Sequence, residues 1–422
     1  ARAGWPNDPS VNVPLCTAVG TQQSAGSCPD GQGGTIFCWK DDRTGTSDIY
    51  AQRVDASGRR LWGTFGMAVC TATGSQYLPV IASDGAGGAY IAWTDGRSGS
   101  DHIYIQRLDG SGKNAWTDNG LALCTAANYQ RNPSIATDAT GGAVVAWRDY
   151  RSGTNADVYA QQIARSGAVQ WTANGVAVCT AAENQDGPRA IADATGGAIV
   201  VWQDYRAGNW DIYAQRIMAG GSAAWVANGV AVCATTESQQ GGSARSDGAG
   251  GIVATWYDNR SGNFDVYVQR MDESGVVQWT AGGVAVCAAA GTQQYPRVAD
   301  DGAGGAVVAW EDLRSGELDV YAQRVSAAGS ALWTANGVVV CGAADIQQGL
   351  VLCPAAFFGH RAARMKMTAP GRIGRAGDFA AQNNAFLPPL RVGLRNGAQQ
   401  RPRIGVHRPA EQLLTAGVFD NP

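Results

Sequence analysis

One stretch of the sequence carries the side chains best suited to chemistry. Residues 147–157 combine a tryptophan with two arginines and two aspartates, in the order Trp-Arg-Asp-Tyr-Arg-Ser-Gly followed by Asp157. Carboxylates and guanidinium groups in one loop could bind a cation or transfer a proton. The stretch recurs six times, however, and its tryptophans are Trp39, Trp93, Trp147, Trp202, Trp256 and Trp310. A catalytic centre needs one well-placed copy, so the repetition favours a structural role in every repeat.

We expect this Trp-x-Asp-x-Arg motif to brace each repeat. Asp149 should cap turn amides, Arg151 should make a forked contact to a carboxylate or to carbonyls, and Trp147 should fill the space between repeats. The alternative is a calcium loop, in which residues from Asp312 to Asp319 present oxygens. An arginine inside the loop opposes a cation, so the sequence predicts no cofactor, with calcium as the weaker alternative.

A cysteine followed six residues later by a glutamine forms a second repeated pair. The cysteines are Cys16, Cys70, Cys124, Cys179, Cys233, Cys287 and Cys341. Equivalent positions in a ring lie farther apart than the roughly 4.4–6.8 Å that a disulfide requires between Cα atoms, so we expect buried thiols. The glutamines should either bond their own loops or line a polar pocket at the centre. The candidates for such a pocket are Gln130, Gln185, Gln239 and Gln293.

Two further cysteines, Cys28 and Cys38, flank a turn in the first repeat. Other repeats have alanine at both positions, as in Ala82 and Ala92. Matched small residues suggest that the two positions face each other across a hairpin, where a disulfide could form.

The loops differ between repeats mainly in their aromatic residues. Tyr150, Tyr205, Trp210 and Phe264 occupy loop positions that other repeats fill with smaller or polar residues. A cluster of exposed aromatic side chains suits stacking on sugar rings or gripping a peptide. The alternative is that they only cover neighbouring loops.

The spacing of the motifs predicts the elements that position these residues. The tryptophans are 54 residues apart, with one interval of 55, and each repeat contains four short strands separated by glycine-rich turns. We therefore predict an all-β fold, a β-propeller of four-stranded blades with six complete repeats. The first residues hold an extra copy of the last strand, Val11 to Cys16, which predicts closure as a seven-bladed ring. Six blades are the alternative.

The chain divides by composition into residues 1–348, the propeller, and residues 349–422, a tail rich in Arg, Gly and Pro. The tail could be a flexible extension, a diverged last blade or an out-of-frame segment. Residues 354–422 hold ten basic and three acidic side chains, which leaves 22 basic and 32 acidic residues in the rest. An acidic body is a poor partner for nucleic acid.

The repeat resembles the propeller repeat families such as kelch and WD-repeat proteins, without their signature residues. It is more similar to uncharacterised bacterial repeat proteins, apparently secreted, that carry Trp-x-Asp-x-Arg-Ser-Gly followed by Asp-Ile-Tyr-Ala-Gln-Arg. The resemblance covers residues 11–348 and implies a propeller and an extracellular or cell-surface setting. The first residues lack the apolar core of a signal peptide, as in a processed product or a cytosolic chain.

Enzyme signatures are scarce in the sequence. There are three histidines, and no nucleotide-binding loop or nucleophile elbow occurs. No apolar run is long enough to span a membrane. We therefore expect a non-catalytic, monomeric binding or scaffold module that recognises a glycan or a protein through one loop face. A carbohydrate-active hydrolase or lyase with acidic residues near the channel mouth is one alternative, and a purely structural surface protein is another.

Overall fold

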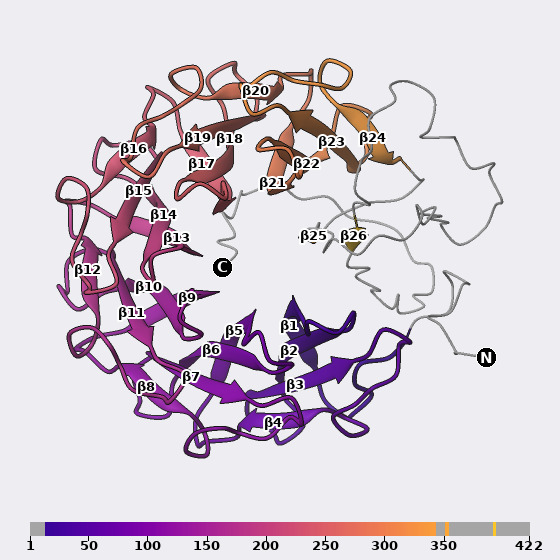
Figure 1. The fold of residues 1–422 in the computed structure, drawn as a ribbon, viewed down its shortest axis with the longest axis vertical. Helices are drawn as coiled ribbons and strands as arrows, with labels where there is room; N and C mark the ends of the chain where they lie inside the picture. The colour runs from indigo at the N-terminus through magenta and orange to yellow at the C-terminus, as the bar shows by residue number, and fades with distance from the viewer. Residues whose placement is uncertain (1–12, 343–350, 354–390, 394–422) are drawn as a thin grey trace, which may run out of the picture.

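The protein is an all-β propeller. The computed structural model describes residues 13–342, 351–353 and 391–393, and these contain six four-stranded antiparallel sheets, the blades, which follow one another around a common centre (Figure 1). In every blade the strands are hydrogen-bonded in sequence order, as in β1-β2-β3-β4. None of the described residues belongs to a helix that could cross a membrane.

Each blade has one strand at the centre of the arc and three at increasing distance from it. The inner strands are β1 (Gln22–Pro29), β5 (Gln76–Ser83), β9 (Gln130–Thr137), β13 (Gln185–Ala192), β17 (Gln239–Ser246) and β21 (Gln293–Asp300). The second strands are β2 (Thr35–Asp41), β6 (Ala89–Asp95), β10 (Ala143–Asp149), β14 (Ala198–Asp204), β18 (Ile252–Asp258) and β22 (Ala306–Asp312). The third strands are β3 (Asp48–Val54), β7 (His102–Leu108), β11 (Asp157–Ile163), β15 (Asp211–Ile217), β19 (Asp265–Met271) and β23 (Asp319–Val325). The outer strands are β4 (Met67–Cys70), β8 (Leu121–Cys124), β12 (Val176–Cys179), β16 (Val230–Cys233), β20 (Val284–Cys287) and β24 (Val338–Cys341).

The core lies between the blades. In β10, every side chain from Ala143 to Trp147 is fully buried. One hydrophobic cluster joins Val144 of the third blade to Val200 and Trp202 of the fourth. A single thin sheet cannot shield both of its faces from water, so each blade is stabilised by stacking on its neighbours. This confirms the stacking expected from the repeat.

The outer strand is shorter than the sequence suggested. We expected it to run from about Val169 through Trp171 to Cys179, but regular pairing is confined to β12, and Val169 forms only an isolated bridge to Ile163. The intervening glycine, Gly175, has a φ of 85°, which breaks the extended conformation.

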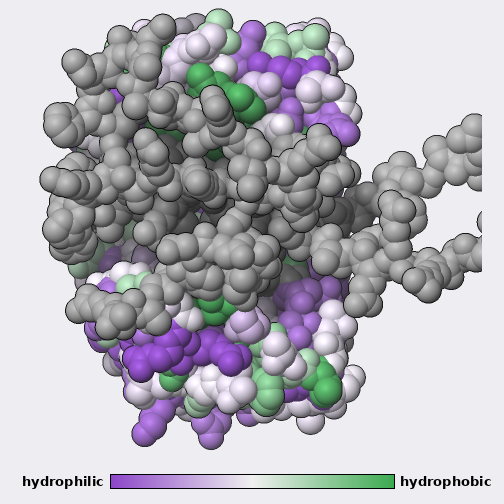
Figure 2. All heavy atoms as spheres, turned by 90° about the vertical axis from the view of Figure 1, so that its right-hand side faces the viewer, coloured by the Kyte–Doolittle hydropathy of each residue, from purple (hydrophilic) through white to green (hydrophobic). Residues whose placement is uncertain are grey.

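Closure as a seventh blade falls largely outside the described residues. The extra strand predicted from Val11 begins among residues 1–12, and Val13 to Cys16 form no strand. Of the predicted tail, the structure describes β25 (Val351–Cys353) and β26 (Arg391–Gly393), which pair with each other. Figure 1 shows this pair on the open side of the arc, between the sixth blade and the first. Viewed from that side, the described surface mixes hydrophilic and hydrophobic residues (Figure 2).

The loops that follow the second and outer strands lie together on one face, which we call the loop face. The amide of Tyr150, after β10, donates to the Tyr129 carbonyl, before β9, at 3.0 Å. The Tyr205 amide donates in the same way to the Asn184 carbonyl at 2.9 Å. These bonds confirm that the Asp-x-Arg loops and the Cys-x5-Gln loops share a face, and the tight turns lie at the other end.

Candidate functional site

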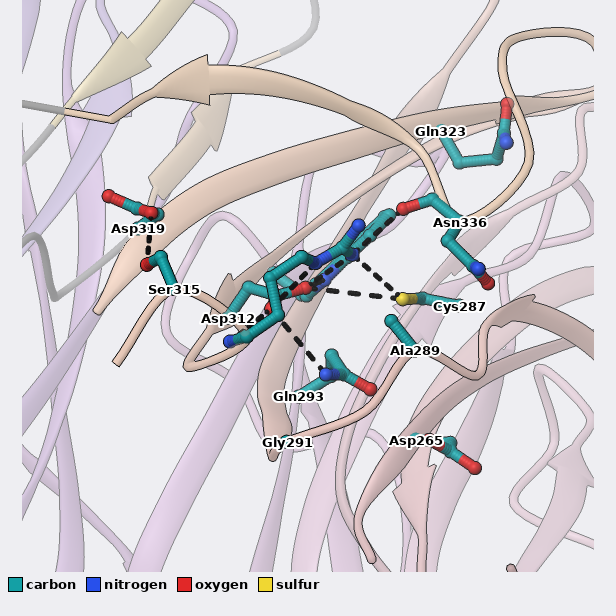
Figure 3. Close-up of polar contacts among 12 residues, drawn as sticks. Asp265, Cys287, Ala289, Gly291, Gln293, Asp312, Ser315, Asp319, Gln323 and Asn336 are labelled. Carbon is teal, nitrogen blue, oxygen red and sulfur yellow. Dashed lines mark hydrogen bonds and ion pairs between the residues drawn. The ribbon is translucent and has the colours of Figure 1, made fainter. Parts of the chain in front are cut away.

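The Trp-x-Asp-x-Arg motif braces the joint between two blades, as expected. In the sixth blade Asp312 accepts hydrogen bonds from Trp310 Nε1 at 2.7 Å and from the Arg314 amide at 2.9 Å. Arg314 also contacts both carboxylate oxygens, through Nε at 2.9 Å and Nη2 at 2.6 Å. Its Nη2 donates to the sulfur of Cys287 in the fifth blade at 3.0 Å. Figure 3 shows Asp312 beside Cys287 and Gln293 in this cluster.

The carboxylates of the candidate calcium loop are bonded by side chains of the protein itself. Asp312 is engaged by the tryptophan and the arginine, and Asp319 accepts a hydrogen bond from Ser315 Oγ at 2.7 Å. Within the described ranges, no group of three or more His, Cys, Asp or Glu residues could hold a metal ion.

The aspartate that begins the third strand has the electrostatics of an acid, but it recurs in other blades. Burial, followed by the nearby charge of Asp149, raises the pKa of Asp157 to about 6, and burial raises the pKa of Asp211 to the same value. A carboxyl group with such a pKa could donate a proton near neutrality. Equivalent aspartates begin the third strand in other blades, as Asp265 and Asp319 do, so this position belongs to the repeated blade joint.

The four candidate glutamines do not line a pocket. Gln130, Gln185, Gln239 and Gln293 are fully buried. Their amides bond their own loops, as when Gln185 Nε2 donates to the Ala182 carbonyl at 3.1 Å. These glutamines therefore stabilise their own loops, which is the other of the two roles that the sequence allowed.

The two cysteines of the first hairpin are not directly opposite each other. The register of β1 and β2 pairs Cys38 with Gly26 and pairs Cys28 with Ile36. We expected facing positions, but both repeated alanines are offset in the same way, since Ala92 pairs with Val80. No disulfide joins Cys28 to Cys38 in the structure.

The four candidate aromatic residues are partly buried on the loop face, and each packs on another aromatic ring. Tyr150 lies 4.2 Å from Tyr129 between ring centroids, and Tyr205 lies 5.0 Å from Trp210. Phe264 packs edge-on against Tyr257 at 5.0 Å. They form three separate pairs in blades three to five rather than one cluster.

Sequence reasoning missed the positions where the loop face meets the centre. These are the residue after each repeated glutamine and the residue between Trp and Asp of the motif, which are paired across the inner and second strands. We call this set the mouth ring; its pairs are Gln23 with Lys40, Tyr77 with Thr94, Arg131 with Arg148, Asp186 with Gln203, Gln240 with Tyr257, and Gln294 with Glu311. The strands around these positions repeat, whereas the pairs differ in every blade. That variation was the signal in the sequence.

The mouth ring is connected from blade to blade. Arg148 Nη1 of the third blade lies 3.0 Å from Asp186 Oδ2 of the fourth. Gln203 of the fourth blade accepts a hydrogen bond from the Gly241 amide of the fifth at 3.4 Å. Tyr257 of the fifth blade is 5.8 Å from the Tyr295 ring of the sixth, and burial, followed by Tyr295, raises the pKa of Tyr257 to about 12. Polar and aromatic groups from separate blades therefore meet at this end of the centre.

A β-bulge follows the mouth ring in the inner strands. The pairing shifts after the second residue, and the third residue has a positive φ, such as 52° at Leu78 and 50° at Tyr295. Gly187 and Gly241 hold this position in the fourth and fifth blades. Leucine and tyrosine adopt this conformation only at a cost in energy, and bulges commonly redirect side chains beside binding sites.

Below the mouth ring, a cavity of about 470 Å³ lies between the inner strands. The fifth residue of each inner strand lines it; these residues are Gly26, Val80, Ser134, Arg189, Ser243 and Arg297. The described lining contains two arginines and no carboxylate.

Comparisons with known proteins place the chain among solved structures by shape alone. No family model matches it, and no curated protein matches it. A protein of unknown function from Dyadobacter fermentans is 10% identical with a TM-score of 0.43, over 71% of this chain and 92% of that one. An α-L-arabinofuranosidase of Fusarium graminearum in complex with arabinobiose is 11% identical with a TM-score of 0.41, over 74% and 96%. An endo-arabinase from Bacteroides thetaiotaomicron is 11% identical with a TM-score of 0.34, over 77% and 97%.

These similar structures correct one expectation. The expected non-catalytic binding or scaffold module is wrong by this comparison, because the neighbours with a named activity are enzymes that act on carbohydrate. Similarity at this level of identity bears on the fold alone.

Proposed function

We propose that the protein is a carbohydrate-active hydrolase or lyase whose acid and base lie in the mouth ring. Asp186 and Glu311 are the carboxyl groups of this ring, and other blades have no carboxyl group at the equivalent positions. The aspartates of the repeated motif, in contrast, recur from blade to blade. This difference is the observation that carries the proposal. Cleavage of glycosidic bonds commonly uses a pair of carboxyl groups on opposite sides of the bond.

The surroundings of the two acids suggest their roles. Asp186 forms an ion pair with Arg148 and accepts a hydrogen bond from the Gly187 amide at 2.7 Å, which suits a carboxylate that acts as base or nucleophile. Glu311, which is 5% exposed, would supply the proton to the leaving oxygen. They come from the fourth and sixth blades, so a sugar chain would lie across the mouth between them.

The aromatic residues of the loop face border this site. Tyr150 accepts a hydrogen bond from Arg148, and Phe264 packs on Tyr257 of the mouth ring. Tyr205 and Trp210 belong to the blade that carries Asp186. We assign all four the role of contacting sugar rings.

The test is turnover of a polysaccharide panel by the purified protein. Asp186→Asn and Glu311→Gln should each lower cleavage at least about 100-fold, because general acid–base groups contribute that much. Asp118→Asn, an exposed aspartate outside the ring, is the matched control and should cleave normally. Trp210→Ala should raise KM more than it lowers kcat. Wild-type rates in both acid variants would refute the proposal.

The proposal also covers the setting of the reaction. We propose an extracellular or cell-surface monomer with a glycan substrate, in line with the resemblance of its repeats to secreted proteins. The reaction is assigned to side chains of the chain, without a cofactor. EDTA should therefore leave the rate unchanged, and a loss that calcium restores would contradict this assignment.

A further inference from the structure

The central cavity concentrates positive charge at one level. Arg189 of β13 and Arg297 of β21 occupy equivalent positions, the fifth residue of each inner strand. The same level carries the hydroxyl groups of Ser134 and Ser243. Equivalent positions in the first two blades are Gly26 and Val80, so the charge is specific to this side of the cavity.

These two arginines lack the partners that other arginines near the centre have. At the mouth, Arg148 pairs with Asp186 at 3.0 Å. Towards the opposite face, Arg245 donates to the carbonyls of Ser246 and Gly305 at 2.6 Å each and lies 3.7 Å from Asp300. Arg297 donates only to the carbonyl of its neighbour Pro296 at 3.2 Å, and Arg189 has no hydrogen bond to any described residue.

The pKa values of both arginines are lowered, which is consistent with their lack of close partners. The Arg189 side chain is exposed to the cavity, but the protein atoms around it lower its pKa. The charge of Arg297 lowers this pKa further, although Asp186 acts in the opposite direction. Burial also lowers the pKa of Arg297, although the charge of Glu311 acts in the opposite direction. Two cations that repel each other where protein replaces much of the surrounding water are costly, and an anion between them would offset that cost.

We propose that Arg189 and Arg297 form an oxyanion site in the central cavity, which takes a carboxylate or sulfate group carried by a glycan. A guanidinium presents paired N–H donors that match the two oxygens of such a group, and the serine hydroxyls can donate as well. As a glycan subsite, the inference rests on the proposed function. Arg189 is three residues along β13 from Asp186, on the far side of the bulge at Gly187. An acidic sugar bound there would place a neighbouring unit at the mouth ring.

The first experiment measures binding to polygalacturonate, to a sulfated polysaccharide, to neutral arabinan and to inorganic sulfate by calorimetry. One of the two anionic polysaccharides should bind, and Arg189→Met and Arg297→Met should each weaken this binding at least about tenfold, as expected for a lost charge-assisted contact. Arg59→Met removes an equal charge from an exposed position and serves as the control. Equal binding by wild type and Arg189→Met would overturn the proposal. Binding of inorganic sulfate alone would overturn the glycan assignment.

A second measurement separates the site from a structural role. Because Arg189 is unmatched, Arg189→Met should have the same melting temperature as wild type or a higher one, and millimolar sulfate should stabilise wild type more than the variant. A lower melting temperature in Arg189→Met without ligand would contradict an unmatched charge. Wild type that binds polygalacturonate through Arg189 without cleaving it would keep the oxyanion site and refute the proposed function. Cleavage of neutral arabinan that does not depend on Arg189 would do the reverse.

Discussion

At the scale of single residues, repetition separates structural carboxyl groups from candidate catalytic ones. Asp149 and its equivalents are fully buried and engaged by tryptophan and arginine in each described blade, so they cannot reach a substrate. Asp186 and Glu311 lie in a ring of positions that differ between blades. A raised pKa alone would point to Asp157 and Asp211 instead, and their recurrence at the equivalent position of other blades rules against that choice.

The pKa of Asp157 predicts a particular pH dependence of stability. Its folded pKa of about 6 lies above the ordinary value of 3.8, so between these values the folded state holds a proton that the unfolded state has lost. This group therefore favours folding at low pH, and its contribution falls as pH rises from about 4 to about 6. Asp157→Asn, which stays neutral, should melt roughly 1–3 °C higher than wild type at pH 7.5.

The advantage of the asparagine variant should shrink as the pH falls to 4.5, where the wild-type carboxyl group is protonated. The exposed Asp118→Asn is the control and should show no such change between the two pH values. Thermal melts at pH 4.5 and 7.5 provide the measurement. An Asp157→Asn variant that melts below wild type at pH 7.5 would show that the charged form is stabilised rather than penalised.

At the scale of elements, one turn determines where the tryptophan of each blade can pack. Gly175 precedes β12 with a φ of 85°, and a Cβ there would lie 2.5 Å from Cη2 of Trp147 and 2.7 Å from the Ala160 carbonyl oxygen. The turn therefore needs glycine both for its backbone conformation and for its closeness to the ring. The same approach to Trp202 occurs at Gly229 in the next blade.

Gly175→Ala should thus cost more than the conformation alone explains. We expect a loss of at least about 3 kcal/mol in the free energy of unfolding, from the left-handed backbone and the collision with Trp147 together. Gly153→Ala in the same blade is the matched control, since its φ is 78° but the nearest atom to a new Cβ is 3.6 Å away. It should cost about 1 kcal/mol. Equal losses in urea unfolding would show that the tryptophan can move away.

At the scale of the whole molecule, the fold could be predicted because its information is periodic. The repeated Trp-x-Asp-x-Arg and Asp-x-Tyr-x-Gln positions mark the ends of strands, and alternation between turns sets which loops share a face. The structure confirms the four-stranded blades and the common loop face. The register of Cys28 and Cys38 could not be predicted, because a bulge in each inner strand shifts the pairing by an amount that sequence spacing does not reveal.

The candidate site was harder to predict for a related reason. The aromatic residues were visible because they interrupt otherwise similar loops. Asp186, Glu311 and Arg189 lie within strands, where their neighbours looked architectural. Which of them face the centre depends on the bulge and on the packing of inner strands from different blades, and neither follows from one repeat considered alone.

The repeated contacts between neighbouring blades also predict how the protein resists local unfolding. Each joint buries one thiol beside an arginine of the next blade, as with Cys179 and Arg206 at 3.2 Å, and burial raises the pKa of Cys179 to about 12. Stability in stacked repeats comes from similar nearest-neighbour contacts, so no internal joint should open first.

Iodoacetamide at pH 8 should therefore modify the partly exposed Cys16 in the native protein. It should leave five joint thiols unmodified until urea unfolds the chain; these are Cys70, Cys124, Cys179, Cys233 and Cys287. Peptide mapping by mass spectrometry measures each site, and modification of one joint thiol as fast as Cys16 would reveal a weak joint that the uniform contacts do not predict.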